Sequence, residues 1–272
     1  MLTRQQRDEL ARRLRRAERD RAPIPPLVAE HPQLTADDAY EIQLANIGRR
    51  LAATAVAGHK VGLSSEVMQR MMGVDEPDYG HLLADMRWHE GEPVDVDRYC
   101  APRIEVEVGF VLGSDLPGGD CTEQDVLERT EALVPALELI DSRIADWRIS
   151  LPDTIADNAS SAGFLLGEAR IPPAEVDPRK IDVVLRRDGE PIAEGRSDAV
   201  LGNPVTAVAW LARKVAGFGV RLRAGNVVLP GSCTRAVDVG AGQEFTAEFR
   251  TGERLLGAVR ASFASFPERS GR

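Results

Sequence analysis

Three glutamates are spaced in a way that can assemble a metal site. Glu105 and Glu107 stand two residues apart in the run 104–112, which alternates like a strand, so both side chains leave the same face. That pair alone is typical of a solvent-facing strand. Glu138 lies further along, inside the apolar run 134–140. A carboxylate among such neighbours is costly unless it is paired or binds a cation.

Two adjacent strands joined by a helix can bring these three carboxylates to one point. Repulsion there would raise the pKa of each group, and a hard dication removes the conflict. Ligation by oxygen alone favours Mg²⁺ or Mn²⁺ over zinc and leaves coordination positions open. Those positions suit a small 2-oxo acid that chelates through its carboxylate and keto oxygens. The sequence therefore predicts a divalent-metal centre formed by Glu105, Glu107 and Glu138.

Two further polar residues are candidates, although each has an ordinary structural interpretation. Lys60 lies between Gly58 and Gly62, where the backbone can approach a ligand closely. Taken alone, a lysine of this kind is more often an ordinary surface residue. Asp78 belongs to the acidic stretch 75–80, which we expect to form a polar turn after a short helix that begins near residue 64. We interpret His59 as structural.

Two polar segments are weaker candidates. The stretch 157–161, which contains Ser160, joins two apolar runs and fits a capped turn as well as a substrate pocket. The stretch 231–234 follows a predicted strand and is a comparable candidate for a ligand-facing loop.

Several familiar signatures are absent from the sequence. It contains no GxxxxGK[ST], no GxGxxG between a strand and a helix, no HExxH and no GxSxG. These absences argue against common NTPases, dinucleotide enzymes, zincins and α/β-hydrolases. The three cysteines are odd in number and scattered, which indicates neither a disulfide framework nor a CxxC metal knuckle.

Composition limits the class of protein and its partners. A chain of 272 residues with 43% hydrophobic residues can bury a substantial core as one large domain, or as one domain with a small cap. Its formal net charge of −9 makes nucleic acid a poor partner. The N-terminus lacks the apolar core of a secretory signal, and no stretch reaches membrane-spanning length. We therefore expect no membrane association and a cytoplasmic location.

The first part of the chain predicts helices. Residues 2–22 form a strongly charged helical pattern, which the Pro-rich stretch 23–26 ends. Thr35 is a predicted N-cap, with Asp37 and Asp38 in the first turn of the next helix. We predict a helical N-terminal cap over residues 1–56 and a β-rich catalytic domain over residues 57–272.

The remainder is rich in short apolar runs that Gly, Pro and Asp interrupt. Strands are predicted at 104–112, 134–140, 181–187, 191–194, 227–230, 244–250 and 255–263, with a hairpin at residues 188–189. Two helices interrupt them. One follows the N-cap Thr122, and the other begins at Asn203 and ends at Gly217.

Five segments together resemble one known family. In order along the chain they read GHKVGLSS, GVDEPDYGHLLADM, PRIEVEVGFVL, ALELIDSRIADWRISLPDTIADNASS and AGNVVLPG. They are similar in order and spacing to the 2-keto-4-pentenoate hydratases of the fumarylacetoacetate hydrolase superfamily. The resemblance extends from about residue 35 to the C-terminus.

The resemblance implies an α+β fold, a mixed β-roll with a small helical N-terminal cap. It also implies that Glu105, Glu107 and Glu138 bind the metal and that Lys60 and Asp78 are catalytic. Ser160 and the backbone around Leu83 would then bind substrate. One departure is Arg103, where lysine is frequent in relatives; we expect it to lie off the glutamate face.

The resemblance further implies a ring-like homo-oligomer, a pentamer or decamer, that can associate with the next aldolase or a sister decarboxylase. The expected activity is hydration of 2-hydroxypenta-2,4-dienoate to 4-hydroxy-2-oxopentanoate in meta-cleavage degradation of aromatic compounds. The segment 142–154 looks more like the hydratase form than the decarboxylase form. The alternatives are a 2-oxo-3-hexenedioate decarboxylase, an acylpyruvate hydrolase and a non-catalytic partner subunit.

Overall fold

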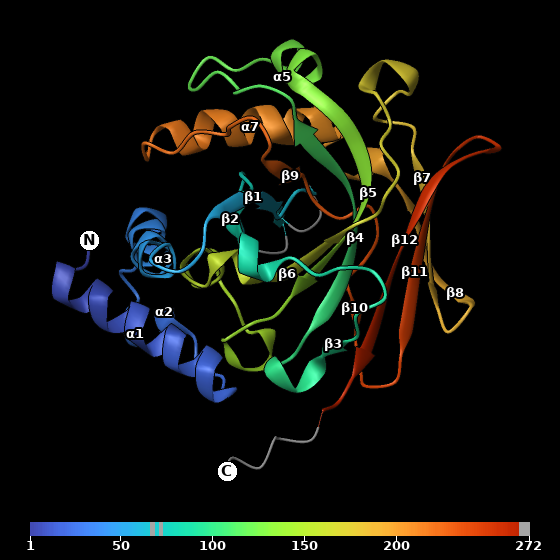
Figure 1. Ribbon diagram of the computed structural model, residues 1–272. Coiled ribbons are helices and arrows are strands. Elements are labelled where there is room, and N and C mark those ends of the chain that lie inside the picture. Colours follow the sequence, from blue (N-terminus) through green and yellow to red (C-terminus); the bar gives the residue numbers. More distant parts are fainter. Residues whose placement is uncertain (66–68, 71–72, 267–272) are drawn as a thin grey trace.

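The computed structural model describes residues 1–65, 69–70 and 73–266 (Figure 1). The α-helices are α1 (Arg4–Asp20), α2 (Leu27–Glu30), α3 (Ala36–Arg50), α5 (Glu123–Arg129), α6 (Leu151–Ala156) and α7 (Pro204–Ala216). The strands are β1 (Val56–Gly62), β2 (Asp78–Leu83), β3 (Val94–Asp95), β4 (Arg103–Leu112), β5 (Thr130–Ile140), β6 (Ser161–Leu166), β7 (Asp182–Arg187), β8 (Glu190–Arg196), β9 (Val227–Leu229), β10 (Val237–Asp238), β11 (Glu244–Thr251) and β12 (Arg254–Ala264).

Capping residues begin the N-terminal helices, and the sequence predicts the one at Thr35. Thr3 caps α1 and Thr35 caps α3, each in a capping box that satisfies backbone N–H groups of the first turn. Leu10 and Leu14 of α1 and Ile42 of α3 belong to the same buried cluster as the strands of the body. The division at residues 56 and 57 stays a prediction.

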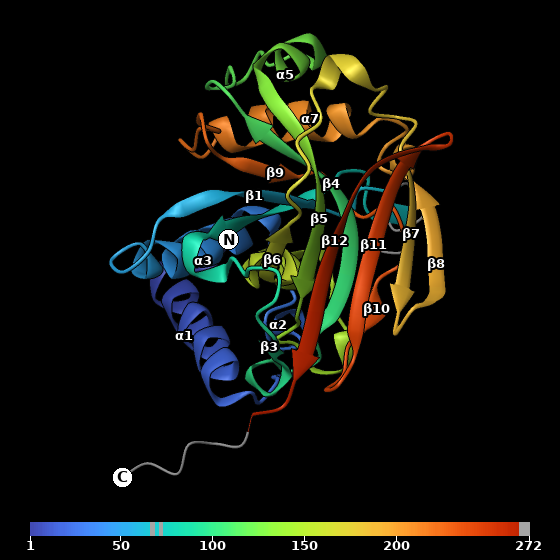
Figure 2. The same ribbon diagram turned by 45° about the vertical axis from the view of Figure 1, so that its right-hand side comes forward.

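Two mixed sheets form the body. Among the described residues, the larger sheet runs in the order β2-β1-β9-β4-β5-β6, with β10 paired to β4, and the smaller runs β3-β12-β11-β7-β8. Most neighbours are antiparallel, whereas β1 pairs with β9, and β12 with β3, in parallel. Figure 1 shows the larger sheet between the N-terminal helices and the smaller sheet, and Figure 2 shows the same order. The predicted α+β fold is confirmed.

Each predicted strand corresponds to a strand of the structure, whereas one predicted turn is partly wrong. The 188–189 hairpin joins β7 to β8, and α7 begins after the N-cap Asn203. The predicted polar turn at 75–80 is wrong in its last part, because Asp78 is already the first residue of β2 and pairs with Gly62. The short helix expected from residue 64 lies partly outside the described residues.

Two general features bear on the class of protein. No described helix has both the length and the apolar character needed to cross a membrane. Cys100, Cys121 and Cys233 are free thiols.

Candidate active site

The three glutamates meet on one face of the larger sheet. The antiparallel register of β4 and β5 places Glu105 directly opposite Glu138 and Glu107 opposite Ala136, so all three carboxylates leave the same side. One oxygen from each glutamate lies within 4.8 Å of the others. Glu107 and Glu138 have no solvent-exposed surface, and Glu105 is partly buried. The structure thus brings together the residues that the sequence singles out.

Burial and mutual repulsion dominate the electrostatics of this cluster. Burial raises the pKa of Glu105 to about 7, with Lys60 opposing the rise and Glu138 adding to it. Burial also raises the pKa of Glu107, and both other glutamates add to that rise. For Glu138, burial raises the pKa against the lowering effects of Lys60 and Ser161. Several carboxylates in so small a volume require a cation or a proton.

Lys60 provides one positive charge beside the cluster. Its Nζ lies 3.5 Å from Glu138 Oε2 and donates a hydrogen bond to the carbonyl of Ala159 at 3.0 Å. Burial alone would lower the pKa of Lys60, but the charges of Glu138, Glu105 and Asp78 outweigh it, and the pKa is raised. In the sheet, β9 separates β1 from β4 and ends at Leu229, the residue that pairs with Lys60.

Asp78 faces the same cluster from β2. The register places it diagonally across from Lys60, and burial raises the pKa of its carboxyl against the effects of Lys60 and Thr154. A side chain at Gly62 would put a Cβ 2.1 Å from Asp78 Oδ1, so the glycine is required for Asp78 to sit there. Gly62, two residues after Lys60, thus makes room for the carboxylate of Asp78.

The loop after β9 contributes a backbone donor. The N–H of Gly231 donates to Glu107 Oε2 at 2.6 Å, and φ of Gly231 is 128°, a conformation that favours glycine. The prediction that segment 231–234 faces a ligand is consistent with this position. The hydrogen bond itself was missed, because it depends on where the chain returns after β9.

Ser160 and Leu83 occupy different surroundings. Ser160 is buried, and its Oγ has no hydrogen-bond partner among the described residues. Leu83 ends β2 and packs in a small apolar cluster with Ala136 and Phe164, beside Glu138. The structure adds Thr154, and it adds Ser161, which lay in the candidate stretch 157–161 without being singled out; their hydroxyls lower the pKa of Asp78 and Glu138 respectively.

The expectation for Arg103 is wrong. Residues 103 and 105 share a face of β4 because side chains alternate along a strand, so Arg103 lies on the glutamate side. Its Nε is 2.8 Å from Asp238 Oδ1, and its guanidinium lies 4.5 Å from the centre of the Trp147 ring. Its charge lowers the pKa of Glu105, although burial of that carboxyl is the dominant effect.

His59 lies on the opposite face of β1 from Lys60. Its ring packs 4.7 Å from that of His81, its partner on β2. Burial lowers the pKa of both imidazoles, to about 4 for His81. These rings are away from the carboxylates, which agrees with a structural interpretation of His59.

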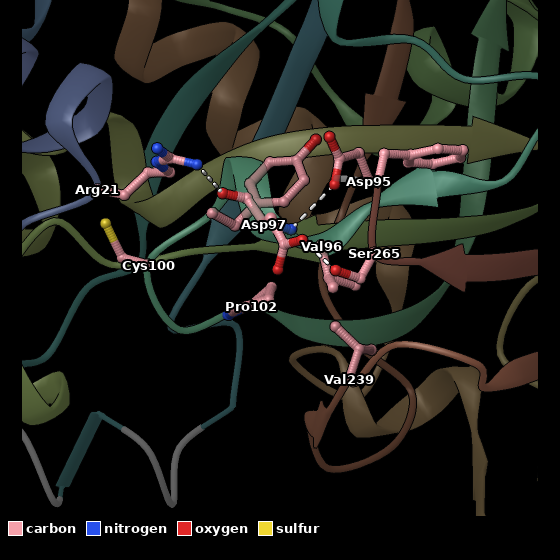
Figure 3. A pocket seen from close by; sticks show the side chains of 10 residues that line it. Arg21, Asp95, Val96, Asp97, Cys100, Pro102, Val239 and Ser265 are labelled. Atoms are coloured by element: carbon pink, nitrogen blue, oxygen red, sulfur yellow. Dashed lines mark hydrogen bonds between the residues drawn. The ribbon is translucent and has the colours of Figure 1, made fainter. Parts of the chain in front are cut away.

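An open hollow at another place on the molecule contains none of these residues (Figure 3). It is lined in part by Arg21, Asp97 and Ser265. Asp97 already receives a hydrogen bond from Arg21 on its carbonyl and one from Ser265 on its carboxylate. The buried carboxylates, and not this surface hollow, are therefore the candidate site.

The donor set of the site fits a hard divalent cation. Glu107 Oε1 and both oxygens of Glu138 are buried with no hydrogen-bond partner among the described residues. Lys60 alone does not balance three glutamates and Asp78. Oxygen ligands in this number suit Mg²⁺ or Mn²⁺.

Similarity to known proteins agrees with this geometry. Residues 60–264 match the family described as "Fumarylacetoacetate (FAA) hydrolase C-terminal". The chain is 42% identical over 265 residues to a 2-keto-4-pentenoate hydratase of Paraburkholderia xenovorans, covering 97% of each chain. It is 41% identical over 247 residues to the 2-oxo-hept-4-ene-1,7-dioate hydratase of Escherichia coli, covering 88% of this chain and 92% of that one.

A solved structure is similar along almost the whole chain. The 4-oxalocrotonate decarboxylase from Pseudomonas putida G7, complexed with magnesium and adipate, matches with a TM-score of 0.92 and 34% identity. The match covers 97% of this chain and 99% of that one. The chain therefore belongs to the fumarylacetoacetate hydrolase superfamily and, within it, to the 2-keto-4-pentenoate hydratase family.

Proposed function

We propose that this chain is a metal-dependent hydro-lyase that adds water to 2-hydroxypenta-2,4-dienoate, giving 4-hydroxy-2-oxopentanoate, in meta-cleavage degradation of aromatic compounds. The observation that carries the proposal is the convergence of Glu105, Glu107 and Glu138 beside Lys60. Hydratase chemistry is the activity for which the relatives at about 40% identity are named. Such a set of oxygen ligands can hold a hard divalent cation, which a 2-oxo acid can chelate through its carboxylate and keto oxygens.

The proposed ligands of Mg²⁺ or Mn²⁺ are Glu105, Glu107 and Glu138. When bound, such a cation polarises the oxygen on C2 of the substrate and so favours charge development there. The N–H of Gly231 orients Glu107 for this task through its 2.6 Å hydrogen bond.

Lys60 and Asp78 are the proposed catalytic side chains. Lys60 is charged at neutral pH, because neighbouring carboxylates raise its pKa, and it can hold the C1 carboxylate. Asp78 has a raised pKa through burial, which suits a group that transfers a proton or orients the attacking water. The Ser160 hydroxyl and the backbone at Leu83 are proposed to bind substrate.

The test is a direct assay of turnover. The loss of ultraviolet absorbance of 2-hydroxypenta-2,4-dienoate is followed with added Mg²⁺ or Mn²⁺ and after EDTA, and the product is identified. We expect metal-dependent formation of 4-hydroxy-2-oxopentanoate. Glu138→Gln should abolish it, whereas Glu131→Gln, an exposed change on the same strand, should not. Full activity of Glu138→Gln would contradict the metal assignment.

A second candidate is a decarboxylase that acts on 2-oxo-3-hexenedioate. The specific observation in its favour is the similarity to the 4-oxalocrotonate decarboxylase along almost the whole chain. Release of CO₂ from a substrate with a second carboxylate distinguishes the two activities. We expect no such release above background.

The quaternary structure is also a proposal. We expect a ring-like homo-oligomer, a pentamer or decamer, which light scattering coupled to gel filtration measures directly. A monomer of 29.6 kDa would contradict this expectation.

A further inference from the structure

A left-handed turn lies against the candidate site. It is η4 (Asn158–Ser160), and its three residues have φ values of 57°, 50° and 57°. This conformation is uncommon for residues with a side chain; asparagine tolerates it best, alanine and serine less well. Three such residues in succession persist only where their surroundings hold them.

The side chain of Asn158 holds the turn against β2. Its Oδ1 accepts from the N–H of His81 at 2.8 Å, and its Nδ2 donates to the carbonyl of His81 at 2.9 Å. The carboxamide thus accepts one hydrogen bond from the His81 backbone and donates one to it, as a residue of a neighbouring strand would. Gly80 makes the close approach possible, because a Cβ there would lie 2.3 Å from the carbonyl oxygen of Asn158.

Backbone hydrogen bonds hold the other end of the turn. The N–H of Ser160 donates to the carbonyl of Asp157 at 3.0 Å, and the Ser160 carbonyl accepts from Asp141 at 2.8 Å. The carboxamide of Asn158 is therefore the side-chain link between the turn and β2, which is the strand that carries Asp78.

The turn directs a backbone oxygen at the buried lysine. The carbonyl of Ala159, the central residue, accepts from Lys60 Nζ at 3.0 Å, and the same Nζ lies 3.5 Å from Glu138 Oε2. Lys60 is 3% exposed, so little water can replace the carbonyl if the turn moves. The position of the ammonium group therefore depends on the turn.

We propose that Asn158 is a positioning residue: its carboxamide holds the left-handed turn against β2, and the Ala159 carbonyl thereby fixes the Lys60 ammonium beside Glu138. The catalytic consequence rests on the proposed function, because it assumes that Lys60 takes part in turnover. The structural consequence, a fixed Lys60, does not depend on that assumption.

The experiment measures Lys60 directly in the full-length protein with Mg²⁺. The chain has three lysines, Lys60, Lys180 and Lys214, so lysine labelled with ¹³C and ¹⁵N gives few side-chain signals, and Lys60→Arg assigns one of them. Asn158→Gly keeps a residue that tolerates the left-handed conformation and removes only the carboxamide. Steady-state kinetics and thermal unfolding are recorded on the same samples.

We expect the Lys60 signal of Asn158→Gly to move or broaden towards that of exposed Lys180, and kcat to fall about tenfold or more with a smaller change in KM. The matched control is Asp188→Gly. Asp188 is also left-handed, with φ of 52°, and its side chain also accepts from a backbone N–H, that of Glu244, but in a hairpin of the smaller sheet. Its substitution should leave the Lys60 signal and kcat unchanged.

A second variant keeps the test decisive if Asn158→Gly does not fold. Gly80→Ala puts a methyl group where the turn lies and should change the Lys60 signal in the same direction while leaving Asn158 intact. An unchanged Lys60 signal in whichever of these variants folds overturns the proposal. If the Lys60 signal changes in these variants but the wild-type protein does not hydrate the dienoate, the proposed function alone is contradicted.

Discussion

Two groups of acidic side chains in the described part of the molecule, most of them buried, differ in how their oxygens are satisfied. The first group, which we call the glutamate triad, is Glu105, Glu107 and Glu138, the proposed metal ligands. The second group, which we call the anchored aspartates, is Asp38, Asp141, Asp153 and Asp157, all buried. In the triad, Glu107 Oε1 and both oxygens of Glu138 lack a hydrogen-bond partner among the described residues, although Lys60 Nζ lies 3.5 Å from Glu138 Oε2. Each anchored aspartate accepts hydrogen bonds from several donors.

The anchored aspartates join segments that are distant in the sequence. Asp153 accepts from the N–H groups of Leu27 and Ser150, at 2.6 and 3.0 Å. Asp157 pairs with Arg143, whose Nε lies 2.6 Å from its Oδ1. Removing a buried carboxylate that accepts from several donors leaves those donors unpaired and lowers stability, whereas removing one whose oxygens lack hydrogen-bond partners relieves a cost of burial. Replacing members of the two groups should therefore have opposite effects on stability.

The largest expected effect is that of Glu107→Gln. It should lower metal-dependent turnover by about 10³-fold, or about 4 kcal/mol in the barrier. It should also raise the free energy of unfolding of the metal-free protein, because it removes a buried charge from a repulsive cluster. Turnover assays and urea unfolding in EDTA measure both effects. Lower stability of the metal-free variant would break the comparison between the groups.

The second effect is that of Asp153→Ala, which should lower the free energy of unfolding by about 3 kcal/mol because it leaves buried N–H groups unsatisfied. The matched control is Asp125→Ala. Asp125 has the same place in the capping box of α5, but it is more exposed and, among the described residues, accepts no hydrogen bond from a distant segment. The control should lose less stability. Equal losses in urea unfolding would show that the link to Leu27 contributes nothing.

The third effect is stabilisation by metal. Binding to the native state alone should raise the free energy of unfolding by about 2.7 kcal/mol at free metal a hundred times Kd. Thermal unfolding across a titration of Mg²⁺ or Mn²⁺ measures it. The shift should disappear in Glu107→Gln and persist in Glu131→Gln, which is exposed. A shift of the same size in Glu107→Gln would place the ion elsewhere.

The smallest effect concerns His59, which is buried, and whose ring nitrogens also lack partners among the described residues. Burial lowers its pKa in the native state, so the unfolded state binds the extra proton as pH falls below the ordinary value of 6.5. Native stability should therefore fall between pH 7.5 and 5.

His59→Leu should lose less stability over that range of pH and keep its activity within about twofold, because the residue faces away from the triad. Urea unfolding at both pH values checks the first expectation. An equal loss in variant and wild type would contradict it. The expected result would show that a buried imidazole without hydrogen-bond partners, unlike the carboxylates of the triad, does not mark an active site.

The sequence predicted much of the site because its signals are local. Alternation along residues 104–108 placed Glu105 and Glu107 on one face, and the apolar setting of Glu138 marked it as unusual. Capping residues such as Thr35 and Asn203 placed helix starts, because a cap acts within one turn of the chain. Local patterns raised Lys60 and Asp78 only as weak candidates, each with an ordinary structural interpretation, and the extended family motifs supplied their catalytic roles.

Only the tertiary structure decided which groups meet. The register that sets Glu105 against Glu138, the parallel pairing of β1 with β9 and the hydrogen bond from Gly231 to Glu107 all join residues distant in the sequence. Local patterns do not encode such partners, because any strand with suitable alternation can pair with several others. The left-handed turn at Asn158 has the same origin: its conformation persists through contacts with β2, and no property of residues 158–160 taken alone requires it.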